Sequence, residues 1–191
     1  MFPPVYMHHQ NTLELTRSAL VVIDMQEAFR TKIEEFTATA ARIAVMVQAA
    51  KLLNTPIILT EQYPKGLGRT AHEILDALPD SVQAIEKTTF SSCGAEQFQS
   101  QLEQASPRHV LVCGIEAHIC VNQTVHDLLA RGFKVHLLND CITSRDPGNK
   151  QTALAKMQTS GAIPSSVEMA LFELMRDARH EQFRAIQGLI R

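Results

Sequence analysis

The sequence lacks an excess of charge of either sign, and it lacks a long apolar run. Its 191 residues include 18 Lys and Arg against 20 Asp and Glu, whereas binding a phosphate backbone normally requires a basic surface. None of its apolar runs approaches the roughly 18 residues of a membrane-spanning helix. Met1–Gln10 carries prolines and histidines where a signal peptide would need a cationic start and an apolar stretch. We therefore expect a cytoplasmic protein that binds neither nucleic acid nor a membrane.

Cysteine pairs of the structural kinds are lacking as well. The chain has four cysteines, unevenly spaced at Cys93, Cys113, Cys120 and Cys141. This is neither the dense pattern of a disulfide-stapled domain nor the paired CxxC pattern of a zinc site. The cysteines are therefore expected to be reduced thiols.

What the sequence does contain is a series of short apolar runs that alternate with helical patterns. We predict strands at residues 19–23, 56–59, 82–85, 110–113 and 133–138. Apolar residues at a 3.6-residue period predict helices over 33–47 and 121–129, and further helices are predicted at about 150–160 and 179–190. Gly132 occupies the position of a residue that ends the second helix.

This alternation predicts a doubly wound α/β fold. Strands that are apolar nearly throughout imply a mostly parallel sheet with helices on both faces. A chain of 191 residues that is 45% apolar is large enough for one sizeable core. We expect a single domain over residues 1–191, in which 1–17 is an extended N-terminal segment.

Three polar side chains lie where such a fold binds its ligands. Ligands of doubly wound sheets bind outside the carboxyl ends of the strands, near the point where the strand order reverses. Asp24 follows the first predicted strand, and Lys87 follows the third. The fourth leads through a short turn to Cys120, where a helix is predicted to start. An acid, an ammonium group and a thiol are therefore expected at one edge of the sheet.

The motifs around these residues resemble those of the isochorismatase-like cysteine hydrolases. The segments that carry the likeness are Val22–Gln26 with Phe29, Lys87 with Phe90-Ser91, and Cys113–Val121. The segment Thr60–Gly68 is similar to the branch that contains the isochorismatase domain-containing proteins. The likeness extends from about Ser18 to the C-terminus. Three motifs in the same order are a specific signal, whereas any one alone would be weak.

The resemblance implies a site and an architecture. It implies a six-stranded, Rossmann-like three-layer sandwich with an Asp24–Lys87–Cys120 catalytic triad. It also implies a cis peptide bond between Ile115 and Glu116, and an oxyanion hole formed by the backbone N–H groups of Glu116 and Cys120. Members of the family are commonly dimers or larger assemblies, so a homo-oligomer is expected.

The three triad residues suit covalent hydrolysis. An ammonium group about 4 Å from a thiol favours the thiolate by about 4 kcal/mol at an effective dielectric of 20, so Lys87 alone could hold Cys120 ionised. Asp24 opposes this effect, and its better role is to accept the thiol proton during attack. The expected reaction is hydrolysis of a small amide or related compound, with no cofactor.

A metal ion is not expected in this site. Nicotinamidases, which share the triad, place an Asp-x-His pair after the second strand to bind a metal. The corresponding residues here are Glu61 and Tyr63, and tyrosine is a poor substitute for a histidine ligand. We instead expect Phe29, Tyr63 and His118 to line the substrate pocket.

Other interpretations of the same residues stay open at this point. Taken singly, Asp24 could cap a turn, Lys87 could be a surface lysine and Cys120 a small buried apolar residue. The protein could also be redox-responsive, with Cys93 resolving an oxidised Cys120. A third possibility is an interaction protein that kept the fold without turnover.

Overall fold

The chain forms one six-stranded sheet in which every neighbouring pair of strands is parallel. The computed structural model describes residues 9–191. The strands are β1 (Ser18–Ile23), β2 (Ile57–Gln62), β3 (Ile85–Lys87), β4 (His109–Gly114), β5 (Lys134–Ile142) and β6 (Ile163–Ser165). Their spatial order is β3-β2-β1-β4-β5-β6, so the chain order reverses between β1 and β4. The predicted doubly wound α/β class is confirmed.

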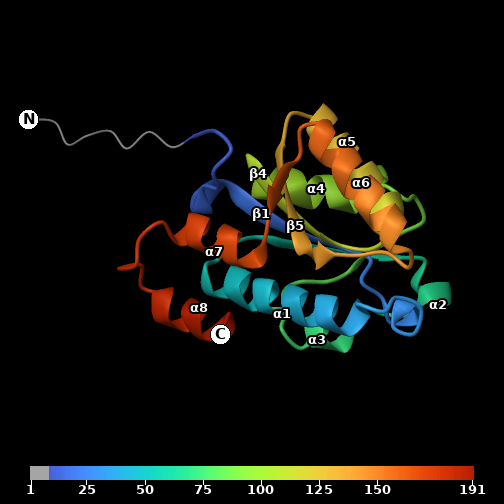
Figure 1. Ribbon diagram of the computed structural model, residues 1–191, viewed down its shortest axis with the longest axis horizontal. Helices are drawn as coiled ribbons and strands as arrows, with labels where there is room; N and C mark the ends of the chain where they lie inside the picture. Colours follow the sequence, from blue (N-terminus) through green and yellow to red (C-terminus); the bar gives the residue numbers. More distant parts are fainter. Residues whose placement is uncertain (1–8) are drawn as a thin grey trace, which may run out of the picture.

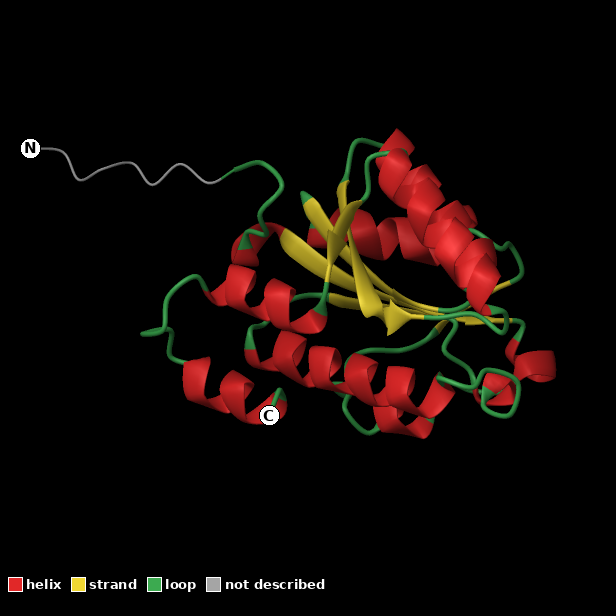
Figure 2. Ribbon diagram, viewed as in Figure 1, coloured by secondary structure: helices red, strands yellow, loops and turns green. Residues whose placement is uncertain are grey.

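Helices cover both faces of this sheet (Figures 1 and 2). They are α1 (Phe36–Leu52), α2 (Pro64–Leu67), α3 (His72–Leu75), α4 (Glu96–Ala105), α5 (Asn122–Ala130), α6 (Pro147–Thr159), α7 (Val167–Met175) and α8 (Phe183–Leu189). Helices α1, α3, α7 and α8 lie on one side of the sheet and α4, α5 and α6 on the other (Figure 1). Among residues 9–191, no helix has the length and apolar character needed to cross a membrane.

The two faces of the sheet belong to two apolar clusters. Leu20 and Val22 of β1 pack with α1 and α7, whereas Val21 and Ile23 pack in the cluster that contains residues of α4 and α5. A central strand that is buried on both faces must be apolar at every position. This explains why β1 appears in the sequence as a continuous run and not as an alternating pattern.

The structure differs from the predicted elements mainly at short segments. Strand β3 begins at Ile85, where the predicted strand 82–85 ends. Strand β6 and the helices α2, α3, α4 and α7 were not predicted from their residue patterns. Gly132 does end α5: it has a φ of 86°, and the N–H groups of Gly132 and Phe133 donate to Leu129 and Leu128. Of the N-terminal segment 1–17, residues 1–8 lie outside the described part. Its last residues, Leu15–Arg17, form a 3-10 helix and not an extended chain.

Two buried histidines lie on adjacent strands, near the ends of β4 and β5 that are opposite the carboxyl edge. The Nδ1 atom of His109 is 3.0 Å from the Nε2 atom of His136, so one ring donates to the other. Burial lowers the pKa of both rings, and the neighbouring His109 and Lys134 lower the pKa of His136 further, to about 4. The folded protein therefore favours the neutral pair.

This histidine pair should make stability depend on pH. Between pH 6.5 and 4 the unfolded chain binds more protons than the folded protein, so the free energy of unfolding should fall by about 2–3 kcal/mol as the pH is lowered. Carboxylates such as Glu27, whose pKa is lowered from 4.5 to about 2 mainly by its hydrogen bond with Arg30, lose their contribution only as the pH falls below about 4.5. Urea unfolding at pH 6.5, 5.5 and 4.5 measures the effect. His136→Gln should flatten the dependence, and substitution of the exposed His9 should not. An equal slope in His136→Gln and the wild type would contradict this assignment.

Candidate active site

A buried ion pair joins the carboxyl ends of β1 and β3. Asp24 follows β1 with a φ of 49°, and Lys87 is the last residue of β3. The Lys87 Nζ atom lies 2.6 Å from Asp24 Oδ2, with 0% and 3% of the two side chains exposed. The other carboxylate oxygen of Asp24 accepts a hydrogen bond of 2.7 Å from the Thr60 hydroxyl on β2. Three neighbouring strands thus place and orient one carboxylate.

The Lys87 ammonium group has further acceptors within the protein. It donates to Gln62 Oε1 at 2.7 Å and to the backbone oxygens of Thr89 and Phe90 at 3.1 Å. A lysine is rarely buried unless its charge is paired and its N–H groups are satisfied. These acceptors satisfy the N–H groups of Lys87 inside the molecule, and its burial excludes the surface-lysine interpretation.

Cys120 lies in a π-helical turn, Ala117–Val121, between β4 and α5. Such turns often occur at functional sites. Burial and the Asp24 carboxylate raise the pKa of the Cys120 thiol to about 12, although the Lys87 ammonium lowers it. The structure therefore brings all three predicted residues together. It differs from the sequence-based expectation in one respect: burial and the Asp24 carboxylate outweigh the charge of Lys87, so the Cys120 thiol favours its protonated form at neutral pH.

The turn before Cys120 contains a cis peptide bond between Ile115 and Glu116, where the family resemblance places one. Gly114 begins this turn with a φ of 120°, and a Cβ atom there would collide with the carbonyl oxygen of Ile23. Only glycine suits this close approach of β4 to β1. Among residues 9–191, the Glu116 N–H group donates to no acceptor, so it is available to a ligand.

The Glu116 side chain is fixed by Arg145. The backbone N–H of Arg145 donates to the buried Glu116 carboxylate at 3.0 Å, and its Nε atom lies 3.0 and 3.1 Å from the two carboxylate oxygens. The turn is also tied to the region after β5, where Thr143 O accepts from the N–H of Ala117 at 2.9 Å. The oxyanion-hole candidates therefore lie on a backbone that is held from two sides.

A pocket of about 270 Å³ opens at Cys120. It has apolar walls with two cationic side chains and one carboxylate. The lining residues are Phe29, Lys32, Gln62, Leu67, Phe90, Ile115, Glu116, Ile119, Cys120 and Arg145. Phe29 occupies the place expected of it. Ile115, Glu116 and Cys120 were predicted in the cis peptide, the oxyanion hole and the triad. The other lining residues were not predicted in the site, because segments that are distant in the sequence carry them.

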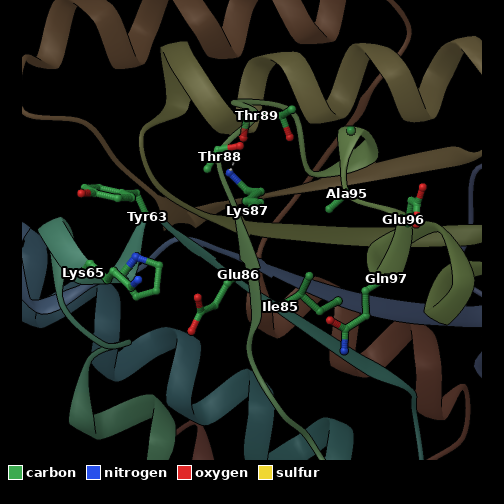
Figure 3. A pocket seen from close by; sticks show the side chains of 12 residues that line it. Tyr63, Lys65, Ile85, Glu86, Lys87, Thr88, Thr89, Ala95, Glu96 and Gln97 are labelled. Atoms are coloured by element: carbon green, nitrogen blue, oxygen red, sulfur yellow. Dashed lines mark hydrogen bonds between the residues drawn. The ribbon is translucent and has the colours of Figure 1, made fainter.

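Two predicted pocket residues lie elsewhere. Tyr63 has a φ of 39°, is 55% exposed and lines a larger hollow of about 560 Å³ along the edge strand β3. Figure 3 shows this hollow, with Tyr63 on one side of β3 and Ala95 on the other. His118 turns toward Ser144, whose hydroxyl lies 3.1 Å from its Nδ1 atom. Neither residue is among those that line the Cys120 pocket.

The position that binds metal in nicotinamidases is occupied differently here. The Glu61 Oε1 atom accepts hydrogen bonds of 2.7 Å from both the N–H and the hydroxyl of Thr70. A separate group with suitable spacing consists of Glu27, His72 and Glu73. Arg30 already bridges its two carboxylates at 2.7 and 2.8 Å, so this group is an ion-pair cluster.

The chain is similar to known proteins over most of its length. A family model described as the isochorismatase domain matches residues 18–169. Isochorismatase domain-containing protein 2 of Danio rerio is 41% identical over 91% of this chain and 86% of its own length.

Two solved structures have the same fold as this chain. A structure described as MAR1 ribonuclease from Caenorhabditis elegans has a TM-score of 0.90 and 36% identity, and the match covers 94% of this chain and 92% of that one. The YCAC gene product of Escherichia coli, described as an octameric hydrolase of unknown specificity, has a TM-score of 0.86 and 20% identity. This match covers 99% of this chain and 91% of that one. At that identity the second structure shows only a shared fold.

Proposed function

Because the chain belongs to the isochorismatase family, we propose that it is a hydrolase in which Cys120 attacks the electrophilic carbon of a small amide or related compound. The observation that carries this proposal is the buried Asp24–Lys87 pair beside the thiol. A buried ion pair is a weak source of stability, because the cost of removing two charges from water offsets their attraction. Its place beside a pocket-lining cysteine therefore favours a chemical role.

The first step begins from a protonated thiol. As the Cys120 sulfur adds to the carbonyl carbon, its proton passes to Asp24, which Thr60 and Lys87 hold in place. The positive charge of Lys87 stabilises the thiolate as it forms. The C–N bond then breaks, the proton passes from Asp24 to the departing nitrogen, and the acyl group remains on Cys120 as a thioester.

The second step hydrolyses the thioester. Water adds to the thioester carbon and gives a proton to Asp24, the C–S bond breaks, and that proton returns to the Cys120 sulfur. The products are an acid and the free thiol, so no redox change occurs. We assign the backbone N–H groups of Glu116 and Cys120 to stabilise the oxyanion in both steps, and the free Glu116 N–H group supports this assignment.

Trapping the intermediate tests the proposal. Wild-type protein should be incubated briefly with a panel of small amides, ureido acids and vinyl ethers, quenched in acid, and measured by intact mass. At least one compound should add an acyl mass that peptide mapping places on Cys120. Turnover of a panel compound without any acyl mass on Cys120, in quenches taken before the steady state, would contradict the covalent mechanism.

A redox function is the second candidate. Cys93 and Cys120 lie in the same buried apolar cluster, and all four cysteines are free. Burial raises the pKa of Cys93, however, and reactive resolving thiols normally have a lowered pKa and are exposed. Peroxide treatment followed by mass analysis distinguishes the two functions, because stoichiometric formation of a Cys93–Cys120 disulfide would favour the redox function.

The name of the C. elegans relative raises a third possibility, an RNA substrate. The small pocket and the net charge of −2 favour a small molecule instead, and an RNA oligonucleotide in the panel would test this directly. A non-catalytic interaction protein on the same fold would show neither turnover nor an adduct.

We propose that residues 1–191 form a single domain. We also propose that the protein forms a homo-oligomer and that it is cytoplasmic. The exposed Met169 and Phe172 of α7 offer an apolar contact, and the octamer described for the E. coli structure is consistent with such an assembly. Four free thiols suit a reducing compartment. Light scattering would measure the assembly, and a monomer would refute it.

A further inference from the structure

The lining of the Cys120 pocket has more positive than negative charge. We propose that the substrate carries a carboxylate, bound by Lys32 and Arg145, while its amide or ureide carbon meets Cys120. The inference rests on the proposed hydrolase and specifies the substrate class of that same site.

The negative charges at the site are already balanced. Arg145 pairs with the Glu116 carboxylate at 3.0 Å, and Lys87 pairs with Asp24 at 2.6 Å. Lys32 also lines the pocket but has no carboxylate partner within residues 9–191. Its Nζ atom lies 5.8 Å from the centre of the Phe29 ring, another lining residue. One uncompensated cation therefore faces the space in which a substrate would lie.

Arg145 supplies a second group of donors. Its backbone N–H and its Nε atom are occupied by Glu116, but within the described chain its Nη1 and Nη2 atoms donate to no acceptor. The side chain is 53% exposed while its partner is buried. A guanidinium group fixed on one side by a carboxylate presents its remaining donors in a set direction, which suits an incoming planar carboxylate.

The rest of the pocket limits the size of the substrate. Phe29, Leu67, Phe90 and Ile119 form the apolar wall of a pocket of about 270 Å³, which is slightly below the roughly 300–1,000 Å³ of typical ligand pockets. This space suits a chain of a few carbons with a carboxylate at one end and the reacting amide or ureide at the other. It is too small for a nucleotide.

Two alkylating reagents of matched size test the charge preference without a known substrate. Iodoacetate and iodoacetamide both form an S–C bond with Cys120 and release iodide, and they differ only in the carboxylate. The ratio of their rate constants at Cys120 does not depend on the thiolate fraction, because the same sulfur attacks both. Peptide mapping restricts the measurement to this cysteine.

In low salt, Lys32→Gln should lower the iodoacetate-to-iodoacetamide ratio by about threefold or more, since one unit charge near the reacting atom is removed. High salt should shrink the wild-type preference by screening. Arg145→Gln should lower the ratio further, because it leaves the Glu116 carboxylate uncompensated. The matched control is Lys51→Gln on the exposed side of α1, which should leave the ratio unchanged.

The outcomes separate the two proposals. Alkylation of Cys120 with an equal ratio in wild type and Lys32→Gln would overturn the carboxylate site and leave the hydrolase proposal intact. Failure of both reagents to modify Cys120 in the folded protein, even at alkaline pH, would overturn Cys120 as nucleophile, and the carboxylate inference with it. Because Lys32 is exposed, loss of folding in Lys32→Gln is not expected, and thermal unfolding checks it.

Discussion

Cys120→Ala is expected to lower kcat by at least about 10⁴-fold for any amide that the wild-type protein hydrolyses. Removal of a nucleophile leaves only the catalysis that binding and the oxyanion donors provide. The substitution removes one sulfur atom from a side chain that is 7% exposed, so the loss of stability should be about 1 kcal/mol. Steady-state kinetics on purified protein, with thermal unfolding in parallel, measures both quantities.

The matched control is Cys93→Ala, which removes a thiol from the same apolar cluster. Its kcat should stay within about threefold of the wild type if Cys93 only packs. Comparable losses of kcat in both variants would instead favour the redox interpretation. Retention of more than a tenth of the wild-type kcat in Cys120→Ala would exclude the covalent mechanism, because no other cysteine lines the pocket.

The sequence predicts the parts of this molecule that depend on local pattern. The buried strands β1 and β4 are continuous apolar runs, so their positions and parallel pairing follow from periodicity and burial. Asp24 could be identified because it directly follows β1, and Lys87 because it ends β3, both at the carboxyl edge of the sheet. Strand β6, with only three residues, has no pattern long enough to distinguish it from a loop.

The site was harder to predict where its properties depend on several distant residues. The raised pKa of Cys120 arises from burial and from the neighbouring Asp24 carboxylate, and a sequence shows neither the burial nor the distance. Arg145 lies 29 residues after Glu116, and nothing in the local pattern connects them. Tyr63 was expected in the pocket as an apolar aromatic wall, but it lines the hollow along the edge strand β3 instead.

Lys87→Met is expected to destabilise the protein by about 3–5 kcal/mol and to remove most of its activity. The substitution leaves the Asp24 carboxylate buried with no opposite charge, and such a group is costly. Asp24 would then be expected to take up a proton, which prevents it from accepting one from Cys120. Urea unfolding measures the first effect and kcat the second, with Lys65→Met, an exposed lysine near the edge of the sheet, as the control.

The double variant Asp24→Asn with Lys87→Met separates stability from chemistry. Removing both charges should recover a large part of the lost stability, because no uncompensated ion remains buried. It should recover no activity, since neither a base for the thiol proton nor a charge for the thiolate is left. A pair that served only the fold would give the opposite result, with kcat near the wild-type value once stability returned.

The rate of Cys120 alkylation, measured against pH, is an independent test of Lys87. Because Lys87 lowers the pKa of this thiol, an unchanged thiol pKa in Lys87→Met would exclude Lys87 from stabilising the thiolate.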